Sequence, residues 1–547
     1  MSIAPWRVGV AAATLAALVL WSPIPAAAQP TQTTLQRIDT AHRAGTLDSP
    51  TRDLFRAYRV LDRGRIPAAL RADPGQDRPL RCGSRLLRAA RRALPHLSAA
   101  QRLDLEAVLI RGLEPALYAD SHFSAHFELI VGSNGTDQAT IDFWLDTFEQ
   151  VWDAHTIDVG FALPPCSDTQ PFRVYLGNTG PDVPTIEPDV FGWSDLDGSN
   201  CPYVVVQENY ATDPDPVGIA QVTAAHEYHH GVQAAYDWGD PDYWVEATAV
   251  WAEELVFGAV NDYLYYINDN TWLSRPEAAL ALEDGDHEYG NVLWVLHLAQ
   301  RYGGPRAIRR IWERCTFDTP TDATEGYLQD QGASLDVAFV SFTAHLATAD
   351  FVDGALYDPV HTLADVVTYP SAESFTSQVP ESFGSGYVVF RPAEGPIQRL
   401  DVIFRGAAEH NGADIRWGVA LVAETATSWS HQTLTPNTAG DTGGGVNSFG
   451  GDVERVVLAV SVLGPTGAAP GAGGVPFAYE ASLHEDVPVP DGGLAIPDAG
   501  PTADARPGPV DRNQPGCGCR SAAPARELHG MFLLAVFLLL AVRRRPR

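Results

Sequence analysis

The sequence predicts a multidomain protein of the α+β class, and three observations lead to this prediction. The chain has 547 residues, which is too long for one ordinary hydrophobic core. Apolar residues recur at helical spacing up to about residue 118, and strand and helix patterns mix from there to about residue 355. After about residue 360 the apolar period changes to two, with Gly- and Pro-rich turns between short strands, which is typical of an all-β sandwich.

The first 28 residues have the pattern of an export signal. Arg7 precedes an apolar run over residues 8–21, and Ala26-Ala27-Ala28 provides a cleavage site of small residues. We therefore expect residues 1–28 to be a signal peptide and the protein to be exported.

Export would place the cysteines before residue 486 in an oxidising environment, where four cysteines allow three pairings. We favour a disulfide between Cys166 and Cys201, because these residues bracket one loop-rich stretch. For Cys82 and Cys315, free buried thiols are an equally open alternative.

Residues 29–118 are predicted to form a helical N-terminal region. Leu54, Tyr58 and Leu61 share one helix face, arginines fill the other, and no strand pattern interrupts the region. Residues 30–114 hold 16 arginines and 9 acidic residues, a net charge of +7, whereas the rest of the chain has 21 basic and 59 acidic residues, a net charge of −38. Attraction between the two parts favours docking, so the region is a candidate inhibitory or folding-assisting pro-region released before Ser121. The alternative is that these helices belong to the domain that follows.

The overall net charge of −31 argues against nucleic acid or an anionic membrane surface as a partner of the whole molecule. Within residues 119–355 we expect a strand at 127–131, a helix over 141–152, and strands at 172–176 and 203–206. The strand at 203–206 is expected at the edge of a cleft, where an extended peptide could add to the sheet.

Residues 226–230 read His-Glu-Tyr-His-His and fit the pattern H-E-x-x-H, in which two histidines one helical turn apart hold a metal and the glutamate handles a proton. Pro216 stands where a helix can begin, and apolar residues on both faces predict that this helix is buried. His226 and His230 then project from a single face. His229 points away from that face and is expected to be a polar neighbour.

A third metal ligand is needed, because a catalytic zinc site has three protein ligands and one open position. The longer pattern H-E-x-x-H-x-x-G-x-x-H fails, because Gln233 and Tyr236 stand where glycine and histidine are required. Residues 237–243 instead form a turn, and helical periodicity resumes from Trp244. Glu246 lies in the first turn of this second helix and is our predicted third ligand.

The segments HEYHH, WVEATAVWAEE and YGNVLWVLHLAQRYGG resemble those of the gluzincin metallopeptidases, in particular the secreted metalloproteases common in myxobacterial proteomes. The resemblance implies a zincin-like domain over residues 119–355, a Zn²⁺ cofactor, a peptide or protein substrate, and endopeptidase activity with Glu227 as the general base. It also implies that Tyr289 stabilises the oxyanion, with Tyr236 and Tyr243 as competing candidates. Glu253 is expected to hydrogen-bond a ligand histidine, and it is the fallback third ligand.

Two alternatives belong to other classes of function. The chain could be a surface adhesion or binding protein with an inactive or purely structural zinc site, although such a site would not need Glu227. Residues 195–200 could bind calcium, but they lack the downstream glutamate of a full calcium loop, so an Asp-rich turn is the preferred interpretation.

The C-terminal part divides into three segments. Residues 356–486 are predicted to be an accessory β-sandwich, and residues 487–516 a Pro-, Gly- and Asp-rich linker. In residues 517–547 a cysteine motif, an apolar run and an arginine cluster resemble the MYXO-CTERM sorting signals of myxobacterial surface proteins, which a sorting protease reads and removes. The 12 apolar residues 531–542 span about 18 Å, so only transient membrane insertion is expected, and an ordinary tail anchor is the alternative.

Overall fold

The computed structural model describes residues 32–485, apart from residues 74, 110–119, 212, 269–270 and 394. The predicted signal peptide, the linker, the sorting signal and the apolar run 531–542 lie outside the described residues. Among the helices that the structure describes, none is long and apolar enough to cross a bilayer.

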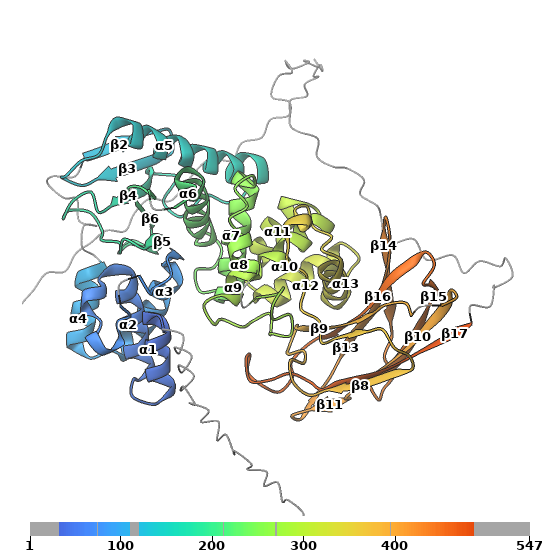
Figure 1. The fold of residues 1–547 in the computed structure, drawn as a ribbon. Coiled ribbons are helices and arrows are strands. Elements are labelled where there is room, and N and C mark those ends of the chain that lie inside the picture. Colours follow the sequence, from blue (N-terminus) through green and yellow to red (C-terminus); the bar gives the residue numbers. More distant parts are fainter. Residues whose placement is uncertain are drawn as a thin grey trace, which may run out of the picture. The chain divides into compact units, whose positions relative to one another are not determined.

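The described chain mixes helix and sheet, as predicted, and its first sheet has six strands in the order β1-β5-β6-β4-β3-β2 (Figure 1). The strands are β1 (Leu80–Cys82), β2 (Asp120–Phe123), β3 (Phe127–Val131), β4 (Phe172–Gly177), β5 (Val190–Leu196) and β6 (Pro202–Gln207). Strands β3, β4 and β6 are parallel to one another, and β5 is antiparallel to β6. The disulfide Cys166–Cys201 confirms the favoured pairing and ties the loop before β4 to the start of β6.

Successive side chains of these strands point to opposite faces of the sheet, so the two faces pack in two different cores. On one face, Val174 and Val204 belong to the central core, which also contains helices α5 (Gln138–Trp152) and α6 (Pro216–Gln233). On the other face, Tyr175 and Tyr203 pack against the N-terminal helices. The N-terminal region therefore shares a core with the sheet.

In the described part of the N-terminal region there are four α-helices: α1 (Thr34–Arg43), α2 (Ser49–Leu61), α3 (Ser84–Ala93) and α4 (Ala99–Leu109). Leu54, Tyr58 and Leu61 of α2 are all buried, which agrees with the predicted helix face. The expectation that no strand interrupts the region is wrong, because β1 runs just before α3 and pairs in parallel with β5. A strand of three residues is too short to show a period-two pattern.

The predicted place of the strand at 203–206 also needs correction. Strand β6 lies inside the sheet between β5 and β4, so it is not at an edge. Its hairpin partner β5, which the sequence analysis did not predict, lies beyond it. The outer side of β5 is in turn covered by β1.

Helices α6 and α7 (Asp242–Phe257) pack closely against each other, and most of their residues are buried (Figure 1). Shorter helices follow: α8 (Leu264–Ile267), α9 (His287–Gly290), α10 (Val292–Arg301), α11 (Pro305–Cys315), α12 (Pro320–Asp330) and α13 (Leu335–Thr348). Helix α9 contacts α7, which brings Tyr289 to the α6–α7 pair.

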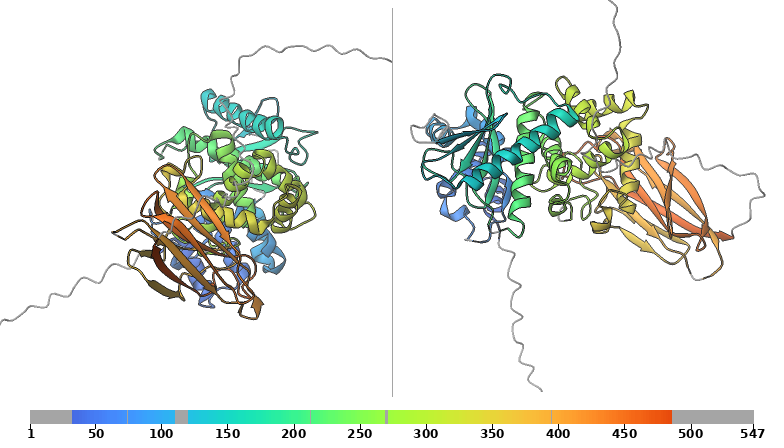
Figure 2. Two further views of the ribbon diagram at one scale, coloured as in Figure 1. Left: turned by 90° about the vertical axis from the view of Figure 1, so that its right-hand side faces the viewer. Right: turned by 90° about the horizontal axis from the view of Figure 1, so that it is seen from above.

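The strands after residue 360, orange in Figure 2, belong mainly to a second sheet of nine strands. They surround a separate apolar core that includes Phe390, Phe404 and Leu458. The strands of this sheet are β7 (Ala364–Val366), β8 (Ser371–Phe375), β9 (Ser385–Phe390), β10 (Gln398–Gly406), β13 (Trp417–Thr425), β14 (Trp429–Leu434), β15 (Asp441–Phe449), β16 (Val453–Val462) and β17 (Phe477–Glu485). A small ribbon of β11 (Glu409–His410) and β12 (Ala413–Asp414) stands beside them.

Candidate functional site

Helix α6 begins where the sequence predicts, because Pro216 fits the first turn and the Asp215 carboxylate accepts a hydrogen bond from the Gly218 N–H as the N-cap. From Gly218 to Gln233 the described side chains are almost all buried. Such a helix can carry histidines only where each ring finds partners.

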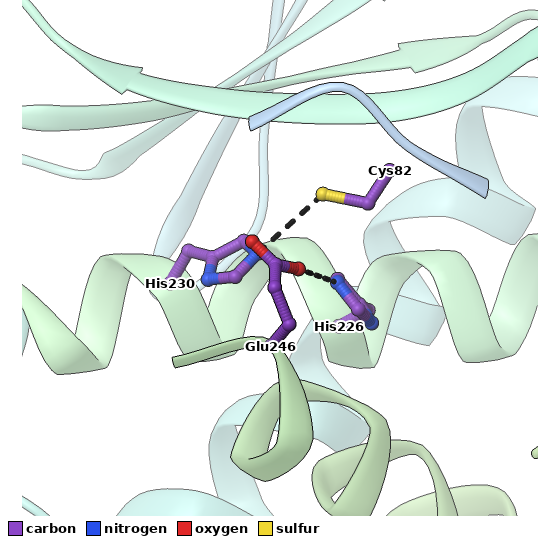
Figure 3. A group of neighbouring side chains, drawn as sticks. All are labelled: Cys82, His226, His230 and Glu246. Atoms are coloured by element: carbon purple, nitrogen blue, oxygen red, sulfur yellow. Dashed lines mark hydrogen bonds and ion pairs between the residues drawn. The ribbon is translucent and has the colours of Figure 1, made fainter. Parts of the chain in front are cut away.

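Three predicted ligands meet at one point between α6 and α7 (Figure 3). The Glu246 Oε2 atom lies 3.3 Å from His226 Nε2 and 3.5 Å from His230 Nε2. A fourth donor, which the sequence analysis did not assign to the site, is Cys82, whose Sγ lies 3.5 Å from His230 Nε2. The four donor atoms all lie within 4.8 Å of one another, and all four residues are buried.

The other ring nitrogen of each histidine is already used. His226 Nδ1 lies 2.6 Å from the Glu253 carboxylate, and His230 Nδ1 lies 2.8 Å from Gln233 Oε1. Both partners can accept a hydrogen bond from Nδ1, so these contacts fix the two rings with their Nε2 atoms facing the common point. This is how residues behind a metal ligand normally orient it. Glu253 lies where it was expected, behind His226 and not in the donor group.

The orientation of the Gln233 amide is fixed by its own contacts. Its Nε2 donates to the Val245 carbonyl at 2.8 Å and to the Thr248 hydroxyl at 3.0 Å, so its Oε1 is left to accept from His230. The only sequence signal for this role was negative, since Gln233 occupies the position where the longer zinc motif requires glycine.

Glu246 uses its two oxygens differently. Arg88 of α3 donates to Oε1 at 2.5 Å, which leaves Oε2 to face the two imidazoles. Burial raises the pKa of a carboxyl, but the nearby His230 and Arg88 outweigh this effect and hold the pKa of Glu246 well below its usual value. Glu246 is therefore an ionised carboxylate, as a metal ligand must be.

Glu227 is fully buried next to this cluster. Its Oε2 accepts a hydrogen bond of 2.9 Å from the Ser84 hydroxyl, and its Oε1 has no partner among the described residues. Gly192 of β5 allows the strand to pass this close, because a Cβ at that position would meet Glu227 Cγ at 2.8 Å. Ser84 was another residue that the sequence analysis did not connect with the site.

Of the three candidate tyrosines, only Tyr289 is at the site. Its ring stacks on that of His226, with centroids 6.3 Å apart, and on that of Tyr266, with centroids 5.1 Å apart. The Tyr236 hydroxyl instead accepts from the Ala162 N–H, and the Tyr243 hydroxyl pairs with Thr321. Tyr266 was not predicted, and its buried hydroxyl has no partner among the described residues.

His229 points away from the donor group, as expected. It contacts His155, with 3.1 Å between His229 Nδ1 and His155 Nε2. Burial and the neighbouring histidines, His155 foremost, hold the pKa of His229 well below its usual value, so this ring is neutral.

The Asp-rich turn after β5 is also explained without a metal. The Asp195 carboxylate accepts from Arg91, and the Asp197 carboxylate accepts from Arg173 and from the N–H groups of Ser199 and Cys201. The preferred interpretation as a hairpin turn therefore accounts for these carboxylates.

The chemistry of the donor set fits a metal. Two imidazole nitrogens, a carboxylate oxygen and a thiol sulfur are the ligand types that Zn²⁺ takes, and the orienting hydrogen bonds behind both histidines are in place.

Comparisons with known proteins do not identify a family or a function for this chain. The chain matches no protein-family model and no curated protein. One solved structure that matches is described as a novel family GH115 4-O-methyl-alpha-glucuronidase, BtGH115A, with specificity for decorated arabinogalactans. That match has 8% identity, covers 48% of this chain and 41% of the other, and has a TM-score of 0.13, which is too low to support an argument about fold or function.

Proposed function

We propose that the protein is an exported, surface-directed zinc metallopeptidase of the gluzincin type. In this proposal residues 119–355 form a zincin-like catalytic domain, and the strands after residue 360 form an accessory β-sandwich. His226, His230 and Glu246 hold the zinc, and Glu227 is the general base.

The observation that carries the proposal is the convergence of His226 Nε2, His230 Nε2 and Glu246 Oε2 beside a buried glutamate. The three atoms come from two helices that are packed together, and hydrogen bonds behind the histidines fix their direction. A purely structural metal would need the ligands but would have no use for Glu227.

Bound zinc would supply Lewis-acid activation of a water molecule and of the scissile carbonyl. Glu227 would accept the proton of the attacking water and later deliver it to the leaving amine. Its unpartnered Oε1 is the oxygen available for this transfer. Tyr289, whose ring stacks on that of His226, is the candidate hydroxyl donor to the carbonyl oxygen that gains charge, and Tyr266 stacks on Tyr289.

A second candidate function is favoured by one observation. Cys82 completes a set of four donors, and zinc sites with four protein ligands are usually structural. The protein would then be a surface adhesion or binding protein with a closed zinc site.

The experiment that tests the proposal is hydrolysis of an unbiased peptide mixture by the purified protein, with and without a metal chelator. We expect cleavage that the chelator abolishes, that added zinc restores, and that is lost in Glu227→Gln. Cleavage that survives both the chelator and Glu227→Gln would overturn the proposal.

A further inference from the structure

The N-terminal region reaches the candidate metal centre through Leu80–Ser84 and, four residues further on, through Arg88. Strand β1 pairs with β5 through hydrogen bonds from the Leu80 N–H to the Asp189 carbonyl, 2.7 Å, and from the Gly83 N–H to the Gly192 carbonyl, 2.9 Å. The Gly192 carbonyl lies on the side of β5 that pairs with β1, and Gly192 itself packs against Glu227. A peptide substrate that adds to the sheet beside Glu227 needs the same backbone groups.

Cys82 lies at the end of β1 with its sulfur among the metal donors (Figure 3). The side chain is 5% exposed, and Sγ is 3.5 Å from His230 Nε2. The Ser84 N–H donates to this sulfur at 3.3 Å. Cys82 therefore adds a fourth donor to the three predicted ligands.

Two residues further on, Ser84 forms a hydrogen bond with Glu227, the proposed general base. Its hydroxyl donates to Glu227 Oε2 and accepts from the Ser194 N–H at 2.7 Å, so it is held from both sides. One segment thus places a thiol at the metal position and a hydroxyl at the general base. In an active peptidase, the attacking water would have to take the position of the Cys82 thiol at the metal and the position of the Ser84 hydroxyl at Glu227.

Arginines of β1 and α3 anchor this segment to acidic residues of the domain that follows. Arg88 contacts both Asp242 and Glu246, and it is only 2% exposed in its side chain. The other pairs are Arg81–Asp262 at 3.1 Å, Arg85–Glu288 at 3.0 Å and Arg91–Asp195 at 2.6 Å. The attraction predicted from the charges of the two parts therefore appears as ion pairs along β1 and α3, one of which involves Glu246.

We propose that Cys82 is a fourth metal ligand and that Leu80–Ser84 keeps the peptidase largely latent, so that wild type cleaves peptides only slowly. This inference rests on the proposed function. The Cys82 thiol loses its proton when its sulfur binds the metal, and activation is a ligand exchange in which water replaces the thiolate, which then takes up a proton. No oxidation or reduction is involved.

The rest of the N-terminal region has a different role in this proposal. Its helices bury the second face of the sheet, including Tyr175, Trp193 and Tyr203, so complete removal would expose a large apolar surface. Helices α1 and α2 therefore stay as part of the fold, and a local displacement of Leu80–Ser84 opens the site.

The test uses the full chain loaded with Co²⁺ in place of zinc, because a thiolate ligand gives cobalt an additional near-ultraviolet charge-transfer absorption. Wild type is compared with Cys82→Ala and with Cys315→Ala, a matched control that removes the other free buried cysteine among the described residues. We expect the absorption in wild type and Cys315→Ala and its loss in Cys82→Ala, which should still bind one metal ion. The zinc form of Cys82→Ala should hydrolyse quenched peptides at least about tenfold faster than wild type.

Persistence of the thiolate absorption in Cys82→Ala would overturn the ligand assignment. The proposal of latency would be overturned if Cys82→Ala lost the metal. It would also be overturned if Cys82→Ala kept the metal but hydrolysed peptides no faster than an active wild type. If no form cleaves any peptide while the cobalt absorption depends on Cys82, the proposed function fails and the ligand assignment stands. Should Cys82→Ala fail to fold, Cys82→Ser and the spectrum of Cys315→Ala decide the same question.

Discussion

Glu253→Gln tests how far the residues behind the ligands control metal binding. The Glu253 carboxylate lies 2.6 Å from His226 Nδ1, and the side chain is 2% exposed. A hydrogen bond to a charged group contributes about 1.5–3 kcal/mol, and one between neutral groups contributes about 0.5–1.5 kcal/mol. Replacing the charged carboxylate by a neutral amide should therefore weaken the hydrogen bond to His226 by about 1.4 kcal/mol. We therefore expect zinc to bind about tenfold more weakly, at the lower end of the about 10- to 100-fold losses typical of such residues.

The assay is competition for zinc between the protein and a chromophoric chelator at about pH 9, because burial raises the pKa of Glu253 to about 7 and that of Glu254 to about 8, and both carboxyls are charged above these values. Glu254→Gln is the matched control, because it removes the same charge from the next residue of α7, which has no described contact with His226. Equal affinities in wild type and Glu253→Gln would refute the reasoning, as would an equal loss in both variants, since that would show a general charge effect.

Three further predictions concern stability, each measured by urea-induced unfolding. Replacing Cys166 and Cys201 together with alanine should cost about 4 kcal/mol, because the disulfide closes a loop with a sequence separation of 35 residues; no loss would contradict the assigned pairing. Burial lowers the pKa of His155 to about 4, so the unfolded chain takes up a proton below about pH 6.5 while the folded chain does not. His155 alone should therefore lower stability by about 2 kcal/mol from pH 7 to pH 5, and His155→Gln should reduce the slope by that amount, while His229 keeps part of it; an unchanged slope would refute the assignment. Gly192→Ala should cost about 1–3 kcal/mol because its Cβ would meet the Glu227 side chain, whereas Gly198→Ala, whose Cβ would have nothing within 4 Å, should be neutral.

Local patterns predicted the elements that carry the site. The helix from Pro216, the second helix bearing Glu246, and the position of Glu253 behind His226 all follow from spacing along the chain, and the structure has them. Helical periodicity determines which side chains share a face, so residues three or four apart could be placed together from the sequence.

Contacts distant in sequence could not be predicted in this way. Cys82 and His230 are 148 residues apart, and no local pattern links them. The strand at 203–206 was wrongly expected at an edge because the β5–β6 hairpin places β5 beyond β6, and the glycine-containing β5 lacks a clear strand pattern. Gln233 was noticed only as a departure from a known motif, because the sequence does not show which side chain lies behind a ligand.

The most direct test of the central claim is the zinc content of the purified full chain and three variants, measured by elemental analysis. We expect one zinc per chain in wild type and in Glu227→Gln, and a severe loss of zinc in His230→Ala and Glu246→Ala. Full zinc in Glu246→Ala, or loss of zinc from Glu227→Gln, would contradict the assignment of ligands and general base.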